Sequence, residues 1–209
     1  MDASTSPVSY PVSINAVLLI VFSAIVIVMN YVPLVALFRA KNIGACTMVA
    51  VLITVNFFTM VNAIIWSNND TQSWWNGAGL CDIEVLIRST CNTLIGSSTC
   101  AMTRNLAQAM DLDNPRLFET RAMRRRRVFV DLAICFTIPF IQMAFHYCIQ
   151  ESRYYIITIY GCADDTVESW QTILLDLIWP PIFAIAMGWY ACKFTLPPFF
   201  LSLTKEQTK

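Results

Sequence analysis

Five stretches of the sequence are long and apolar enough to cross a membrane as helices, and they constrain the fold more than any other feature. A bilayer core about 30 Å thick needs roughly 20 mostly apolar residues in a helix that rises about 1.5 Å per residue. The stretches are 12–38, 43–66, 81–110, 128–149 and 170–194. We therefore expect residues 1–209 to form one all-α domain, a polytopic bundle of five transmembrane helices.

The charge content supports a membrane protein. Only 13% of the residues are charged, whereas soluble domains carry about 25%. Disordered segments, coiled coils and nucleic-acid-binding domains all need abundant charge, so the composition argues against them and against a nucleic-acid partner. The lipid bilayer is the first partner that the sequence predicts.

The third stretch, 81–110, is the most polar of the five. It contains Ser-Thr-Cys-Asn-Thr at 89–93 and Gly-Ser-Ser-Thr at 96–99. Such a helix is too hydrophilic to face lipid, and its small residues allow neighbouring helices to approach closely. We therefore expect other helices to surround it.

Lys and Arg are distributed unevenly between the two ends of the predicted bundle. One of them (Arg153) lies on the side of the N-terminus, and eleven lie on the other side, of which ten are outside the spans and Lys193 is at the end of the fifth. The side richer in Lys and Arg is normally cytoplasmic. The N-terminus is thus expected outside, the C-terminus inside, and the protein in the plasma membrane as a multi-pass protein.

Two cysteines and one asparagine stand out on the predicted outer side. Cys81 opens the third stretch and Cys162 lies between the fourth and fifth, both facing the compartment in which disulfides persist. We predict a Cys81–Cys162 disulfide, with two free thiols as the alternative. Asn69 begins an Asn-Asp-Thr acceptor sequence for N-glycosylation.

Tryptophans also gather on the outer side, at positions 66, 74 and 75. Anchoring in the lipid headgroup layer is the default interpretation of such residues. Lining a site for an apolar ligand is the alternative.

Ionisable side chains inside predicted spans are candidates for a ligand-side polar cluster. Glu84 and Arg88 lie four residues apart and can pair along one helical face. Asp176 has no partner of opposite charge on its own helix, so we predict that it joins Glu84 and Arg88. His146 is expected to be a hydrogen-bonded packing residue.

Basic residues mark the predicted inner side. Arg104 lies near the inner end of the third stretch, and Arg124, Arg125, Arg126 and Arg127 immediately precede the fourth. Topology and contact with anionic lipid account for this run, and docking of a protein partner is a further function that it can serve.

No pattern in the sequence indicates catalysis. GxSxG, HExxH, P-loop and GxGxxG motifs are absent, and the single histidine excludes a site with several histidine ligands. We expect no catalytic residues, no bound metal and no cofactor, and therefore not an enzyme.

Several short motifs, taken in order, resemble those of the fungal a-factor-type mating pheromone receptors, which are class D G-protein-coupled receptors. The motifs are Arg39-Ala40-Lys41-Asn42, Ile65-Trp66-Ser67, Trp75-Asn76-Gly77, Leu80-Cys81-Asp82-Ile83, the stretch from Cys100 through Arg104 to Leu106, Arg153-Tyr154, Tyr160-Gly161-Cys162 and Trp179-Pro180-Pro181. Their order and spacing together are more specific than any one of them.

The resemblance implies a seven-helix receptor that binds a prenylated peptide pheromone and activates a heterotrimeric G protein. Arg104 and Arg124–Arg127 would then be on the G-protein side. The sequence matches the first five spans and ends before a sixth and a seventh. We therefore expect a truncated receptor that does not activate a G protein when expressed alone.

Two other functions remain open. The chain can be a non-signalling membrane protein that pairs with a full-length receptor, as a homo- or heterodimer, and modulates it. A small transporter is the other alternative, indicated only by the polar third stretch and Asp176.

Overall fold

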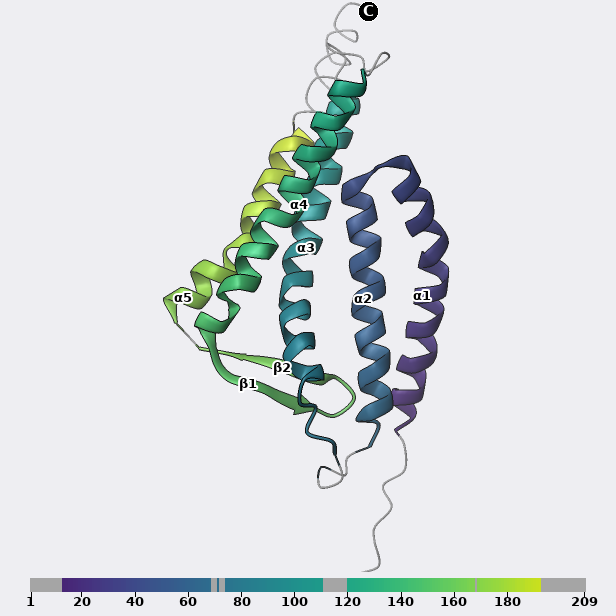
Figure 1. Cartoon of the computed structure of the whole chain (residues 1–209), viewed down its shortest axis with the longest axis vertical. Coiled ribbons are helices and arrows are strands. Elements are labelled where there is room, and N and C mark those ends of the chain that lie inside the picture. The colour runs from purple at the N-terminus through teal and green to yellow at the C-terminus, as the bar shows by residue number, and fades with distance from the viewer. Residues whose placement is uncertain (1–12, 69–70, 72–73, 111–119, 168, 193–209) are drawn as a thin grey trace, which may run out of the picture.

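The computed structural model describes residues 13–68, 71, 74–110, 120–167 and 169–192, and it is a bundle of long helices with one β-hairpin at its end (Figure 1). Asn69 lies outside the described residues, so the predicted glycosylation sequence has no structural account. The elements are α1 (Ile14–Ala40), α2 (Ile43–Ile65), α3 (Leu80–Ala109), α4 (Arg121–Ile149), β1 (Gln150–Ile157), β2 (Gly161–Thr166), α5 (Trp170–Thr172) and η2 (Ile173–Leu177).

A tight turn joins α1 to α2 and makes them antiparallel neighbours. Lys41 ends α1 in the left-handed conformation, with φ of 56°, and its N–H donates to the carbonyl of Phe38. The side chain of Asn42 then accepts from the N–H of Ala45 and caps the start of α2. Hydrogen bonds therefore satisfy some of the terminal backbone groups at the end of α1 and at the start of α2.

The polar helix α3 lies between α2 and α4 and contacts both (Figure 1). Among the described residues, four helices are long and apolar enough to cross a membrane by length and composition: α1, α2, Arg121–His146 of α4, and Trp170–Cys192. α3 is the longest helix, with 30 residues, but is too polar to be among them. The enclosure expected for this helix is thus what the fold provides, since α2 and α4 pack against it.

Helix α4 begins seven residues before the apolar stretch from which it was predicted. Thr120 caps it by accepting a hydrogen bond from the N–H of Met123, and the arginine run forms its first two turns. Hydropathy cannot find this start because arginine has a high helix propensity but is not apolar.

The last long helix, Trp170–Cys192, starts with α5 and a π-helical segment, η2. In η2 the N–H of Ile178 donates to the carbonyl of Ile173, five residues earlier. Pro180 and Pro181 follow directly, and each lacks the N–H of a regular helical turn. Irregular helical hydrogen bonding, such as this π-helical segment, is expected next to a pair of prolines.

A β-hairpin joins α4 to the last helix, and the sequence analysis did not predict it. β1 and β2 pair antiparallel, with Ile156 opposite Cys162 and irregular register nearer to Gln150. The tip turns at Ile159 and Gly161, whose φ values are 68° and 85°. Figure 1 shows the hairpin crossing the end of the bundle from α4 past α3 toward α2.

Candidate functional site

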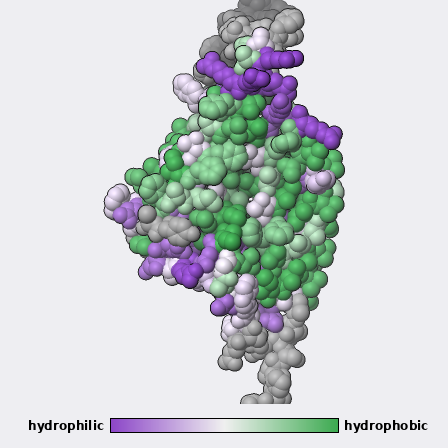
Figure 2. Space-filling view, in the orientation of Figure 1, coloured by the Kyte–Doolittle hydropathy of each residue, from purple (hydrophilic) through white to green (hydrophobic). Residues whose placement is uncertain are grey.

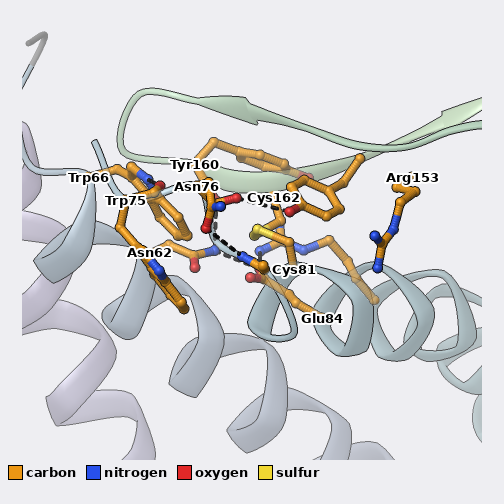
Figure 3. Close-up of a disulfide and its surroundings, with 12 residues drawn as sticks. Asn62, Trp66, Trp75, Asn76, Cys81, Glu84, Arg153, Tyr160 and Cys162 are labelled. Carbon is orange, nitrogen blue, oxygen red and sulfur yellow. Dashed lines mark hydrogen bonds and ion pairs between the residues drawn. A yellow bond between two sulfur atoms is a disulfide. The ribbon is translucent and has the colours of Figure 1, made fainter. Parts of the chain in front are cut away.

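A disulfide fastens the hairpin to the bundle. It joins Cys81, in the first turn of α3, to Cys162 of β2, with a Cα–Cα distance of 5.2 Å (Figure 3). This is the pair that the sequence singled out. Both cysteines are completely buried, so the hairpin lies over the end of α3 as a closely packed cover.

Trp66 forms the floor beneath this disulfide. It is completely buried at the end of α2 and clusters with Cys81, Val85 and Cys162. Its indole N–H donates to the carbonyl of Trp75, and the two indole rings stack with centroids 6.4 Å apart. The headgroup anchor expected at position 66 is therefore wrong, because the hairpin encloses this ring in protein.

Gly77 shows how tightly the cover is packed. Its φ is 69°, and a Cβ at this position would lie 2.4 Å from the sulfur of Cys81 and 3.2 Å from the ring of Trp66. Only glycine combines this backbone conformation with so close an approach.

A polar network lies directly under the hairpin tip (Figure 3). Asn62 of α2 donates to Oε1 of Glu84, at 2.6 Å, and to the carbonyl of Tyr160, at 2.9 Å. Arg88 pairs with the same oxygen of Glu84 at 2.6 Å, and its guanidinium lies 4.4 Å from the ring centroid of Tyr160. The pair predicted on one face of α3 thus extends to α2 and to the hairpin.

Asp176 does not join this network. It accepts a hydrogen bond from Gln142 of α4, at 2.8 Å, and no ion pair between Asp176 and Arg88 occurs among the described residues. The single cluster of Glu84, Arg88 and Asp176 is therefore a wrong prediction. Arg88 already has its carboxylate four residues away on its own helix, so Asp176 bonds to a neutral amide instead.

A second polar group lies on the outer rim of α3. Asp82 pairs with Arg153 of β1 at 2.7 Å, and both side chains reach solvent. Together with His146 and Gln150 they line a small pocket of about 310 Å³. Among the described residues, no three His, Cys, Asp or Glu side chains are arranged to hold a metal ion.

An apolar groove of about 410 Å³ lies between α2, α3 and α4. The hydroxyls of two lining threonines are already used in hydrogen bonds within their own helices. Thr54 donates to the carbonyl of Ala50 and Thr90 to that of Leu86. Phe140, another lining residue, is 63% exposed, so the groove reaches the surface of the bundle. The lining residues are Cys46, Thr47, Ala50, Val51, Thr54, Ile87, Thr90, Cys91, Leu94, Phe136, Pro139, Phe140 and Met143.

At the opposite end, Arg104 is held between helices. Its guanidinium pairs with Asp131 of α4 at 3.0 Å, and Asn105 donates to the other carboxylate oxygen at 2.7 Å. Asp131 is almost completely buried. Arg104 therefore joins α3 to α4 and is not a free surface cation.

The arginine run extends beyond this contact. Arg124, Arg125 and Arg126 are exposed and Arg127 is partly buried on the first turns of α4. Figure 2 shows hydrophilic residues gathered at the two ends of the surface, and the surface between them is mostly apolar.

Sequence reasoning missed three residues of these sites: Asn62, Gln142 and Asp131. Each interrupts a predicted apolar span, and Asp131 is the only acidic residue in the stretch 128–149. A polar side chain within a membrane span needs a partner, and this rule could have singled them out. It could not have named the partners.

Comparison with known proteins gives one consistent family. The STE3 family model, described as "Pheromone A receptor", matches residues 18–201. That family consists of receptors and is not an enzyme class. No solved structure matches the chain.

Curated relatives agree with this match. The pheromone a factor receptor of Saccharomyces cerevisiae is 30% identical over 73% of this chain and 32% of its own length. The pheromone B beta 1 receptor of Schizophyllum commune is 27% identical over 74% and 27%. Pheromone receptor 1 of Mycosarcoma maydis is 29% identical over 66% and 37%. The chain spans about a third of the length of these relatives.

Proposed function

Because the chain belongs to the pheromone A receptor family, we propose that it forms the ligand-binding part of a G-protein-coupled receptor for a prenylated peptide pheromone. One observation carries the ligand class: the groove between α2, α3 and α4 offers almost only apolar atoms. A prenyl chain is apolar and branched, and it dissolves in the bilayer before it meets the protein.

The groove suits entry from the membrane. Two of its three lining threonines, Thr54 and Thr90, donate their hydroxyl protons to backbone carbonyls, so these hydroxyls offer no free donor to a ligand. The peptide part of the ligand would then lie toward the hairpin end, where Asp82, Arg153 and the rings of Trp75 and Tyr160 are accessible.

A cross-linking experiment tests the prenyl site. The probe is a photoreactive farnesyl-cysteine methyl ester, applied to the 209-residue chain in nanodiscs. We expect cross-links in peptides that line the groove and at least a fivefold loss in Ala50→Trp, which fills it. Leu52→Trp is the matched control, because Leu52 lies on the same helix but outside the groove. Equal labelling of both variants would refute the site.

The orientation of the chain is part of the proposal. The disulfide lies at the hairpin end and the arginine run at the opposite end. Disulfides persist outside the cell and basic loops stay inside, so two independent chemistries support a hairpin that faces outside. Glycosylation tags at the two termini test this orientation: modification of the C-terminal tag instead of the N-terminal one would reverse it.

G-protein coupling through the inner end completes the proposal. The inner surface offers the Arg104–Asp131 pair between α3 and α4 and the exposed arginines that follow Thr120. Pull-down of a fungal G-protein α subunit by the chain in nanodiscs tests the contact, and Arg126→Gln should weaken it. Binding that is unchanged in this variant argues against the arginine run.

The alternative function, pairing with a full-length receptor and modulating it, depends on the exposed apolar helix faces. Lipid covers such faces equally well, so they do not favour it over the receptor function. Co-expression with a full-length relative at matched levels separates the two. A lowered pheromone response favours the modulator, and an undiminished response favours the receptor.

A further inference from the structure

A second pocket, of about 450 Å³, lies at the inner end of the bundle, where the turn between α1 and α2 meets the start of α4. One part of its lining is cationic: Lys41 of the turn and Arg121, Arg124 and Arg125 of α4. The other part is apolar: Val128, Phe129 and Leu132. The proposed function uses the exposed arginines of this end only as a contact surface for a protein, and it assigns nothing to the apolar part of the pocket.

The lining residues of α4 form one helical face. Residues 121, 124, 125, 128, 129 and 132 follow the spacing of three and four that places side chains in one stripe. The stripe is basic over its first turn and apolar over the next two. The change from charge to hydrocarbon therefore occurs at a single level along the helix, as it does between the headgroup and the acyl chains of a lipid.

The positive charge at this place is not compensated within the described part of the chain. The first turn of α4 contains no acidic residue, and none of the ion pairs found there involves Lys41, Arg121, Arg124 or Arg125. A helix N-terminus is itself positive, so arginines there raise the local potential instead of neutralising it. Such a site favours an anion, and phosphate in particular.

Lys41 is held in place across from these arginines. Its backbone has a φ of 56°, which costs energy for a residue with a Cβ. The hydrogen bonds of Lys41 to Phe38 and of Asn42 to Leu37 keep it there. The turn thus fixes the position from which the ammonium group reaches the pocket.

We propose that this pocket binds one anionic phospholipid. The phosphate group lies among Lys41, Arg121, Arg124 and Arg125, and an acyl chain lies along Val128, Phe129 and Leu132. Phe129 is 72% exposed, and an acyl chain covers it where a soluble protein partner would leave it facing lipid. The binding of an anionic phospholipid here does not depend on the proposed pheromone site. That the lipid comes from the inner leaflet does rest on the orientation proposed above.

Native mass spectrometry of the purified 209-residue chain tests the site. The probes are phosphatidylserine and phosphatidylcholine with identical acyl chains. We expect one phosphatidylserine to be retained with at least a tenfold preference over phosphatidylcholine. Arg125→Gln should reduce this retention at least fivefold. The matched control is Arg126→Gln, which removes the same charge one residue away and outside the pocket, and it should change retention less than twofold.

A second variant tests the apolar part. Phe129→Ser should lower phosphatidylserine retention at least threefold, whereas Phe22→Ser, at another exposed site on α1, should leave it unchanged. These exposed positions lie outside the packed interior, so the variants should fold, and circular dichroism checks this directly.

Three results would overturn the proposal. Equal losses in Arg125→Gln and Arg126→Gln would mean a diffuse basic field in place of a pocket. Displacement of the lipid by millimolar inorganic phosphate would mean a site for the free anion. Unchanged lipid retention in Arg125→Gln, together with lost binding of a G-protein α subunit, would make the surface a protein contact.

Discussion

Helices α1 and α3 are of similar length but differ in the polarity and the burial of their side chains. α1 has 27 residues, nearly all apolar, and only Ala16 and Ser23 are buried. α3 has 30 residues, many of them polar, and nine of them are buried. In a membrane protein the apolar helix faces lipid, and the polar helix must be enclosed by protein. Hydropathy therefore reports contact with lipid and not burial within the fold.

The hydroxyl groups of α3 find hydrogen-bond partners in two ways. Thr90, Thr99 and Thr103 donate to carbonyls four residues earlier on the same helix. The hydroxyl of Ser97 also reaches another helix: it lies 3.0 Å from the carbonyl of Cys135 on α4 and 3.3 Å from that of Leu94 on its own helix. On the α2 side, Gly44 lets the backbone approach so closely that a Cβ would lie 3.0 Å from the carbonyl of Ser98. Four predictions test this contrast with α1.

Removal of the buried carboxylate should have the largest effect. Glu84→Leu should lower the free energy of unfolding by about 3 kcal/mol, because Arg88 loses its partner in a buried site. Equilibrium unfolding in mixed micelles measures it. Asp82→Leu is the matched control: its partner Arg153 is 78% exposed, so the loss should stay below about 1 kcal/mol. Equal losses would mean that burial does not increase the contribution of the Glu84–Arg88 pair to the stability.

Disruption of the contact between the hairpin and α2 should have the next largest effect on the free energy of unfolding. Gly161→Ala should cost about 2 kcal/mol, since its Cβ would clash with the side chain of Asn62 in a tightly packed site. The Cβ would lie 2.1 Å from Cγ of Asn62. Gly79 has nearly the same φ, 84°, but has nothing within 4 Å of its Cβ position. Gly79→Ala therefore measures backbone strain alone, and a loss as large as that of Gly161→Ala would contradict the contact.

The contact between α3 and α4 through Asp131 should contribute less to the stability. Asp131→Asn should cost about 1.5 kcal/mol, because a neutral amide loses the charge-assisted hydrogen bonds from Arg104 and Asn105. Thermal unfolding in detergent measures the loss. Asp164→Asn, on the exposed side of β2, should change the stability by less than about 0.5 kcal/mol. If the two substitutions behave alike, Asp131 does not hold α3 to α4.

The smallest effect is expected on α1. Phe22→Leu should change the free energy of unfolding by less than about 0.5 kcal/mol, because lipid tails are as apolar as leucine and solvate either side chain. Phe22 is 61% exposed. The same mixed-micelle unfolding measures it, and a loss above about 1 kcal/mol would show that this face of α1 packs against protein.

Much of the site follows from sequence and some of it does not. The Glu84–Arg88 pair was predictable because a spacing of four on a helix brings two side chains together whatever surrounds them. The choice of Cys81 and Cys162 followed from their predicted place on the outer side. Asp176 was assigned to the wrong partner, because its neighbours come from a different helix and depend on how that helix is rotated.

The sequence by itself determined which segments form the long helices, which helix must be enclosed, and the family to which the chain is similar. These are properties of composition and local spacing, and the bilayer imposes them on any chain of this kind. Only the tertiary structure decided that Trp66 packs beneath a hairpin, that Asn62 joins α2 to Glu84, and that Arg104 pairs with Asp131. Each of these contacts brings together residues far apart in the sequence, and a buried polar group can be satisfied by several partners. Helix packing selects which partner lies within reach.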